Sequence, residues 1–154
     1  MHARSTHHAV QDNGVKLVDP RGEMLESSWE VYATSLANAP STDEFVQGIL
    51  ALISELRIDM DRQASIVYAR DTRPSGASLV AALRDGIRAI GAIGRDQGVT
   101  TTPILHYIVR CINTKGTLEA YGEDSEEGYM KKMSAAYKTL VVSAQGEYEA
   151  WMVS

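Results

Sequence analysis

A short apolar run that stops at a basic turn, with a long helical pattern behind it, is the most restrictive feature of the chain. The apolar run covers residues 66–69 within a predicted strand over residues 65–69, and the turn reads Arg70-Asp71-Thr72-Arg73. After Pro74-Ser75-Gly76, apolar residues recur with the spacing of one helical face, at Leu79, Val80, Leu83, Ile87 and Ile90. A buried strand that leads through a turn into a helix is a building unit of α/β proteins.

A second strand and a second helix are expected directly after this unit. Gly91 interrupts the helical pattern, residues 94–98 predict a turn, and residues 99–102 are β-branched enough for a short strand. Thr102 and Pro103 then fit the N-cap and first position of a helix. Two strands joined by a helix are parallel. We therefore predict an α/β fold: a three-layer α/β/α domain with a mixed, mainly parallel sheet, incomplete within this chain.

The flanking segments predict one more strand and three more helices. Residues 15–18 fit a short strand, residues 27–39 fit a helix, and Ser41 or Thr42 fits the cap of a second helix. A last helix is expected to be capped at Ser125. Its apolar residues predict a buried face that comprises Tyr129, Met130, Met133, Tyr137, Leu140 and Val141.

Composition limits the partners and the compartment. The 154 residues carry a formal net charge of −5 and no block of like charges, which gives no support to a nucleic-acid partner. No apolar run reaches the length of a membrane span, so we expect no membrane partner. The single cysteine, Cys111, lies in an apolar helical pattern, which favours a buried thiol and a cytoplasmic protein.

The arginine turn, residues 70–73, allows two interpretations. Arg70 and Arg73 would stand where a strand ends and a helix begins, and backbone N–H groups at such a place bind phosphate. Alternatively, the arginines hold the turn through Asp71. We interpret His106, which lies in the first turn of a predicted helix, as a hydrogen-bonded structural histidine. His7 and His8 are adjacent, and adjacent histidines rarely bind one ion, so we favour a solvated segment over a weak metal site.

Three segments together resemble the α-D-phosphohexomutases. Residues 12–20 (Asp-Asn-Gly-Val-Lys-Leu-Val-Asp-Pro) resemble the stretch that follows the family's catalytic loop. Residues 69–76 resemble its Gly-Arg-Asp-Thr-Arg motif, and residues 98–107 its Thr-Thr-Pro-x-Leu-His-Tyr segment. Their order is that of the eukaryotic phosphoacetylglucosamine mutases, and residues 22–25 and 127–129 fit the same subfamily.

This resemblance implies an isomerase. Such an enzyme moves a phosphoryl group between O6 and O1 of N-acetylglucosamine phosphate, a phosphorylated amino sugar, on the route to UDP-N-acetylglucosamine. A phosphoserine gives its phosphoryl group to the sugar phosphate, and the bisphosphate formed reorients and returns the other one. Mg²⁺, the implied cofactor, bridges the phosphoserine and three aspartates and neutralises charge on the transferred group.

The resemblance also implies which residues would act. Counting back from Asp12 places Thr6 at the phosphoserine position, where it would be a metal ligand once phosphorylated, and His7 at the histidine after it. Lys16 falls on the family's acid/base lysine, and Arg70 and Arg73 on a phosphate- or substrate-binding turn. The loop departs from the family pattern Thr-Ala-Ser-His-Asn-Pro, because it carries Ser-Thr-His-His-Ala at residues 5–9.

The extent of the resemblance predicts three segments. Residues 1–11 are divergent at the catalytic-loop position, residues 12–142 form part of the family's first domain, and residues 143–154 are a divergent tail. The family's Asp-Gly-Asp-Gly-Asp metal run does not occur in the sequence. We therefore expect a partial first domain that is inactive alone. The alternatives are a non-catalytic truncated isoform that binds phosphosugar or a partner, and a gene-model fragment.

Overall fold

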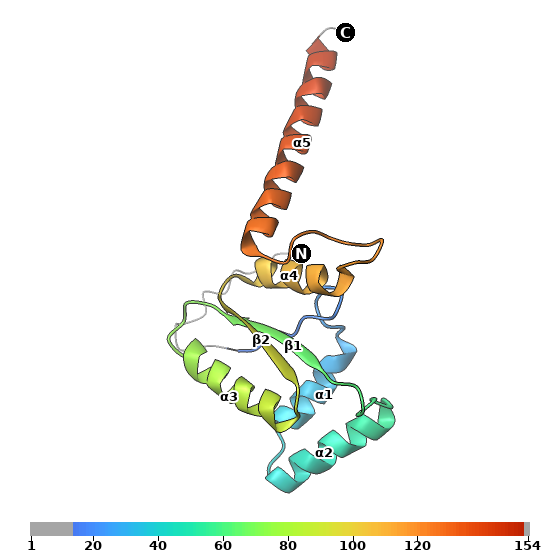
Figure 1. Cartoon of the computed structure of the whole chain (residues 1–154), viewed down its shortest axis with the longest axis vertical. Coiled ribbons are helices and arrows are strands. Elements are labelled where there is room, and N and C mark those ends of the chain that lie inside the picture. The colour runs from blue at the N-terminus through green and yellow to red at the C-terminus, as the bar shows by residue number, and fades with distance from the viewer. Residues whose placement is uncertain (1–13, 153–154) are drawn as a thin grey trace. The chain divides into compact units, whose positions relative to one another are not determined.

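The structure is a computed structural model that describes the backbone of residues 14–152 and the side chains of residues 14–143. The described part of the chain divides into two compact units. Unit 1 takes residues 23–100 together with the chain up to Asp19, and unit 2 takes Pro20–Gly22 together with the chain from Thr101 onward. The elements are labelled in Figure 1.

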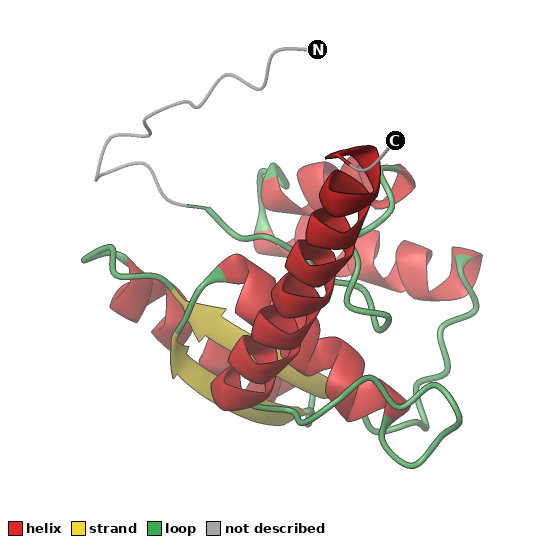
Figure 2. Cartoon of the chain, turned by 90° about the horizontal axis from the view of Figure 1, so that it is seen from above, coloured by secondary structure: helices red, strands yellow, loops and turns green. Residues whose placement is uncertain are grey.

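Unit 1 contains both strands and three of the helices. These are α1 (Ser28–Ala37), α2 (Thr42–Glu55), β1 (Ser65–Arg70), α3 (Gly76–Ala89) and β2 (Ile93–Val99). The strands are parallel, with Ser65 opposite Ile93 and Tyr68 opposite Asp96, and they lie side by side in Figure 2. Helix α3 connects them and packs on both. The α/β class and the parallel connection are therefore confirmed.

Strand β2 corrects one prediction. Residues 94–98 are not a turn and residues 99–102 are not a strand, because β2 covers Ile93–Val99. Its glycines and charged residues have low strand propensity, but pairing with β1 decides the conformation. A Cβ on Gly94 would lie 3.3 Å from the Tyr68 ring and 3.4 Å from Ile87, so glycine lets the strand lie close to both. Gly98, with φ of +71°, lies where the register shifts between Tyr68 and Arg70.

The N-terminal part of unit 1 follows the sequence patterns with one exception. Ser41 caps α2, because its Oγ accepts a hydrogen bond from the Glu44 N–H at 3.2 Å. The strand predicted over residues 15–18 is wrong in extent: only Val18 forms a bridge, with Met24. Helices α1 and α2 pack against each other, and the side chains of Tyr32 and Glu55 are hydrogen bonded between them.

Unit 2 contains α4 (Thr102–Thr114) and α5 (Glu126–Met152). Helix α4 begins one residue earlier than predicted, with Thr101 as the N-cap and Pro103 in the first turn. It carries most of the core in the described part of the chain, and Cys111 is only 1% exposed, as predicted. The buried α4 residues are Ile104, Tyr107, Ile108, Val109 and Cys111.

Helix α5 forms where predicted, but most of its apolar face is not buried. Met130 is 51% exposed, Tyr137 69% and Leu140 69%, and Met133 is also exposed. Tyr129 and Val141 are half-buried, so the prediction of a buried face is wrong for most of its members. The helical period alone identifies an apolar face and cannot show whether a neighbour covers it.

Candidate functional site

The arginine turn lies between the end of β1 and the start of α3 in unit 1. The Arg70 carbonyl accepts a hydrogen bond from the Thr100 N–H at 3.0 Å, so the turn starts from paired strand backbone. The Gly76 N–H then bonds to the Arg73 carbonyl at 3.0 Å as the chain enters α3. The turn therefore occupies the carboxyl end of a parallel strand, the place where α/β proteins bind ligands.

Asp71 and Arg73 hold the turn together. The Asp71 Oδ1 accepts the Arg73 N–H at 3.0 Å, and Oδ2 lies 3.3 Å from the Arg73 Nη1. The two side chains are 48% and 34% exposed. Water screens such an ion pair, so the guanidinium can exchange it for another anion at small cost. The turn-holding interpretation of Arg73 is thus observed directly.

Arg70 is held differently. Its aliphatic stem lies over the buried Gly76, where an added Cβ would be 3.4 Å from the Arg70 Cβ and Cδ. Its Nη1 donates to the Asp71 carbonyl at 3.4 Å, and the residue is half-buried. The packed stem orients the guanidinium at low entropic cost.

The electrostatics of the turn favour an anion. Two guanidinium groups stand beside one carboxylate, and the first turn of α3 contains no acidic residue. The positive end of the helix dipole is therefore not neutralised within that turn. Ser75 precedes α3 without a side-chain cap, so the first N–H groups of the helix are not satisfied by that hydroxyl.

The other predicted site residues are distributed along the chain. Lys16 is exposed in unit 1, on a segment separate from the arginine turn. Thr6 and His7, and with them Thr6 as a possible metal ligand, lie outside the described residues, as does His8. The structure thus brings Arg70 and Arg73 together and leaves their relation to Thr6 and His7 a prediction.

His106 is a hydrogen-bonded histidine, as predicted. Its Nδ1 lies 2.9 Å from the Gly22 carbonyl oxygen within unit 2, and the ring is half-buried. This contact gives the histidine a structural partner.

The described residues contain no cluster of metal-ligating side chains. Among them, no three His, Cys, Asp or Glu side chains stand close enough together to hold a metal ion. A cation such as Mg²⁺ needs several oxygen ligands around one point. The described residues therefore offer no ready-made cluster of three or more such ligands.

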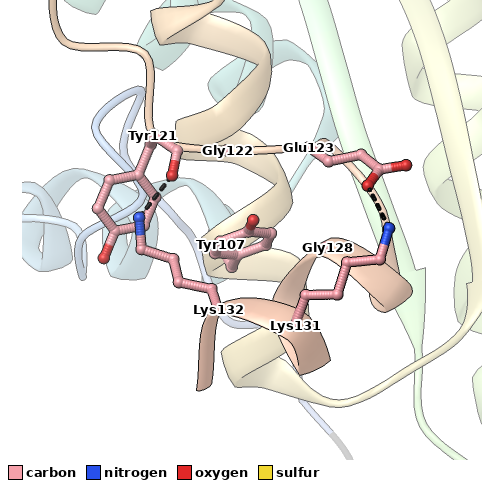
Figure 3. Close-up of a pocket in the computed structure, with 7 residues that line it drawn as sticks. All are labelled: Tyr107, Tyr121, Gly122, Glu123, Gly128, Lys131 and Lys132. Atoms are coloured by element: carbon pink, nitrogen blue, oxygen red, sulfur yellow. Dashed lines mark hydrogen bonds and ion pairs between the residues drawn. The ribbon is translucent and has the colours of Figure 1, made fainter. Parts of the chain in front are cut away.

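Sequence reasoning missed one polar cluster and one cavity. In unit 1, Arg84 on α3 is hydrogen bonded to both Tyr68 and Asp96. Its position in the helical pattern did not indicate these contacts. In unit 2, an open cavity of about 320 Å³ lies at the start of α5, and Figure 3 shows its lining. It is lined by Tyr107, Tyr121, Gly122, Glu123, Gly128, Lys131 and Lys132.

The cations around this cavity already have partners. Lys131 pairs with Glu123 at 3.1 Å, and Lys132 Nζ lies 3.5 Å above the Tyr121 ring and donates to the Tyr121 carbonyl (Figure 3). Burial is the largest cause that raises the pKa of Tyr107 to about 12, and a hydrogen bond with Cys111 adds to it. The cavity is therefore largely apolar, and the arginine turn remains the better candidate for phosphate.

Comparison with known proteins shows the family of the chain. The family described as phosphoglucomutase/phosphomannomutase, alpha/beta/alpha domain I, matches residues 34–120, which include the arginine turn. The chain belongs to this family. The phosphohexomutase resemblance seen in the sequence is therefore confirmed.

Within the phosphohexomutases, the similarity is to enzymes of one name. The chain is 45% identical to phosphoacetylglucosamine mutase of Mus musculus over 146 residues, which cover 93% of this chain and 26% of that protein. It is 45% identical to the Homo sapiens enzyme over 141 residues, 91% of this chain and 25% of that protein. The chain thus spans about a quarter of the length of these curated relatives.

Solved structures of N-acetylphosphoglucosamine mutase are also similar to this chain. A complex of Aspergillus fumigatus N-acetylphosphoglucosamine mutase with glucose 1,6-bisphosphate is 49% identical, with a TM-score of 0.81, over 86% of this chain and 24% of that one. A complex of the A. fumigatus enzyme with GlcNAc-6P and magnesium is 50% identical, with a TM-score of 0.77 and the same coverage. These phosphohexomutases bind phosphosugars, and one of them holds magnesium. In the described part of this chain, no helix is long and apolar enough to cross a membrane.

Proposed function

We propose that this chain contributes the first-domain part of a phosphoacetylglucosamine mutase. Such an enzyme interconverts N-acetylglucosamine 6-phosphate and 1-phosphate, which supplies UDP-N-acetylglucosamine synthesis. The observation that carries the proposal is the domain I match over residues 34–120, with the arginine turn inside it. The 45% identity to two enzymes of this name supports the choice of sugar phosphate.

In this proposal Arg70 and Arg73 hold a phosphate dianion at the start of α3. Arg73 would exchange its exposed Asp71 partner for the phosphate, while the packed stem of Arg70 keeps its guanidinium in place. Forked N–H donors match the oxygens of a phosphate, and backbone N–H groups of the helix add to them.

The transfer itself would involve the loop at residues 5–9 and Lys16. A phosphoryl group on Thr6 passes to the free hydroxyl of the sugar phosphate, and the bisphosphate then returns its other phosphoryl group to Thr6. Lys16 holds or donates the proton that the sugar hydroxyl loses or regains, and His7 supports the loop. Support for these roles comes from the sequence resemblance, because Thr6 and His7 lie outside the described residues.

The proposed reaction also needs magnesium, and this requirement limits what the 154 residues can catalyse alone. A neighbouring structure holds magnesium, but the described residues of this chain offer no cluster of ligands for it. When bound, Mg²⁺ would neutralise charge on the transferred phosphoryl group. We propose that the 154 residues bind phosphosugar weakly and do not isomerise it, which is also what a truncated, non-catalytic isoform would do.

Two further proposals concern boundaries and compartment. We assign residues 12–142 to the first domain, with divergent segments at 1–11 and 143–154, although α5 runs through residue 142 without a break. We also assign the chain to the cytoplasm. Support comes from Cys111, whose thiol is free and buried.

The test combines binding and turnover. N-acetylglucosamine 6-phosphate should raise the melting temperature of the chain, and the double variant Arg70→Ala with Arg73→Ala should abolish that shift. The matched control is Arg88→Ala, because Arg88 lies on α3, the helix that follows the arginine turn, in an exposed pair with Asp85. With Mg²⁺ and a sugar bisphosphate primer, no 1-phosphate should form. No stabilisation of the wild-type chain would contradict the binding proposal, and turnover would contradict the proposed inactivity.

A further inference from the structure

The three-residue turn Pro20–Gly22 lies on α4 and is fixed there by two side chains. The Asn113 Nδ2 donates to the Pro20 carbonyl at 2.7 Å, and the His106 Nδ1 lies 2.9 Å from the Gly22 carbonyl oxygen. Because a carbonyl only accepts hydrogen bonds, the His106 ring carries a proton on Nδ1 in this contact. Both carbonyl groups that face α4 are thus satisfied by α4 side chains.

The backbone of the turn also lies against the helix. Gly22 has φ of +76°, and a Cβ added to it would collide with the His106 carbonyl and lie 2.9 Å from the Arg110 Cβ. His106, Arg110 and Asn113 are spaced four and three residues apart, so they share one face of α4. Glycine at position 22 lets this face receive the turn at close range.

Paired backbone flanks the turn on both sides. The Asp19 N–H bonds to the Glu23 carbonyl at 3.0 Å, and the Glu23 N–H bonds to the Asp19 Oδ1 at 2.8 Å. Further out, Val18 and Met24 form a bridge, and the Leu25 N–H bonds to the Leu17 carbonyl at 3.4 Å. The chain thus forms a hairpin over residues 17–25, and the residue directly before it is Lys16.

We propose that His106 and Asn113 are positioning residues for Lys16. They hold the tip of the hairpin, and the paired legs transmit this restraint along the chain to the lysine. The proposal rests on the proposed function, in which Lys16 handles the proton of the sugar hydroxyl. An acid/base group must stay within reach of that proton, and a loose loop would lose this geometry.

Trypsin measures the restraint, because it cleaves after Arg21 at the tip of the hairpin. Cleavage there should be slow in the wild-type chain relative to cleavage after Arg62, which lies in an exposed loop of unit 1. The variant Asn113→Asp replaces the donor by an acceptor that repels the Pro20 carbonyl, at an exposed position that the fold tolerates. It should speed cleavage after Arg21 on the order of tenfold, as expected for loss of a hydrogen bond.

A conservative pair of variants separates positioning from general destabilisation. His106→Ala should speed cleavage after Arg21, whereas His106→Asn, whose amide N–H can replace the ring donor, should restore the slow rate. Cleavage after Arg62 should stay unchanged in all variants. Equal Arg21 cleavage in the wild type, His106→Ala and Asn113→Asp would overturn the proposal.

The effect on Lys16 needs its own measurement. Backbone ¹⁵N order parameters at Lys16 and Leu17 should fall in Asn113→Asp and recover in His106→Asn relative to His106→Ala, while Ser78 on α3 stays rigid. If the tip loosens but Lys16 does not, the positioning role is wrong. Stabilisation by N-acetylglucosamine 6-phosphate through Arg70 and Arg73 is measured on the same samples. Its absence from the wild type would reject the proposed function and leave the hairpin result intact.

Discussion

The Nη2 atom of Arg84 lies 2.9 Å from the Oδ2 atom of Asp96, and this ion pair joins α3 to β2. The same guanidinium donates through Nε to the Tyr68 hydroxyl on β1, also at 2.9 Å. This hydrogen bond to the Tyr68 hydroxyl is the largest cause that raises the pKa of Arg84 above its ordinary value. One side chain thus connects α3 to both strands.

We expect Arg84→Ala to lower the melting temperature clearly more than Arg88→Ala does. Arg84 loses contacts to two strands, whereas Arg88 loses an exposed pair within its own helix, which is worth about 0.5 kcal/mol or less. Thermal unfolding followed by circular dichroism measures both. Equal effects would show that the Arg84 contacts to Tyr68 and Asp96 add no more to stability than the exposed Arg88 pair does.

Much of the fold could be predicted because local signals agree with the tertiary structure. The apolar run before Arg70, the periodicity through Ile87 and the Ser41 cap all indicate elements that pairing and packing then confirm. The arginine turn could be found for the same reason. Its basic residues interrupt an apolar pattern at a strand end, which marks the turn whether the arginines bind phosphate or hold the turn through Asp71.

The parts that could not be predicted depend on contacts between distant residues. Strand β2 contains two glycines, an arginine and an aspartate, and it becomes a strand because β1 pairs with it and Arg84 satisfies Asp96. The docking of Pro20–Gly22 on α4 joins residues 93 positions apart in the case of Pro20 and Asn113. The exposed face of α5 carries the same pattern as a buried one. The periodicity of apolar residues does not show whether another element covers the apolar face of a helix.

The Cys111 thiol should resist modification in the folded chain. The residue is 1% exposed, and its thiol shares a hydrogen bond with Tyr107. A thiol-specific disulfide reagent should therefore react slowly with the native chain and at once in guanidinium. Cys111→Ser should lower the free energy of unfolding by about 1–3 kcal/mol, because the hydroxyl loses water and gains at most one partner. Rapid reaction without denaturant would contradict the burial.

Alanine variants of Gly22 and Gly116 can be compared to test whether the hairpin tip packs on α4. Their φ angles are +76° and +77°, but a Cβ on Gly116 would meet nothing within 4 Å, whereas on Gly22 it collides with α4. Gly116→Ala should cost about 1–2 kcal/mol through backbone strain alone. Gly22→Ala should cost more in urea unfolding, and equal costs would show that the tip does not lie on α4.

The exposed apolar side chains of α5 should make the chain self-associate. Met130, Tyr137 and Leu140 each expose more than half of their surface, and water disfavours such a continuous stripe. Leu140→Lys should weaken association in sedimentation velocity without lowering the melting temperature. Thr139→Lys, on the neighbouring position, is the control for added charge. A wild-type chain that is monomeric at high concentration would contradict this expectation.

Tyr107 should make stability fall at alkaline pH. Burial raises its pKa to about 12 in the folded chain, against about 10 when unfolded. Below pH 10 the phenol is protonated in both states, so it adds no pH dependence. Between pH 10 and 12 the unfolded chain loses the proton that the folded chain retains. The free energy of unfolding therefore falls with rising pH, by up to about 1.4 kcal/mol per unit.

Urea unfolding at several pH values isolates this contribution when two phenylalanine variants are compared. Tyr107→Phe removes the titrating hydroxyl and should flatten the decline between pH 10 and 12 relative to the wild type. Tyr137→Phe is the control, because it removes the same hydroxyl from a side chain that is 69% exposed, and it should leave the decline unchanged. If the two variants show the same slope as the wild type, then Tyr107 is hydrated in the folded chain. The packing of Tyr107 against Tyr121 and Tyr129 would then not exclude water from its hydroxyl.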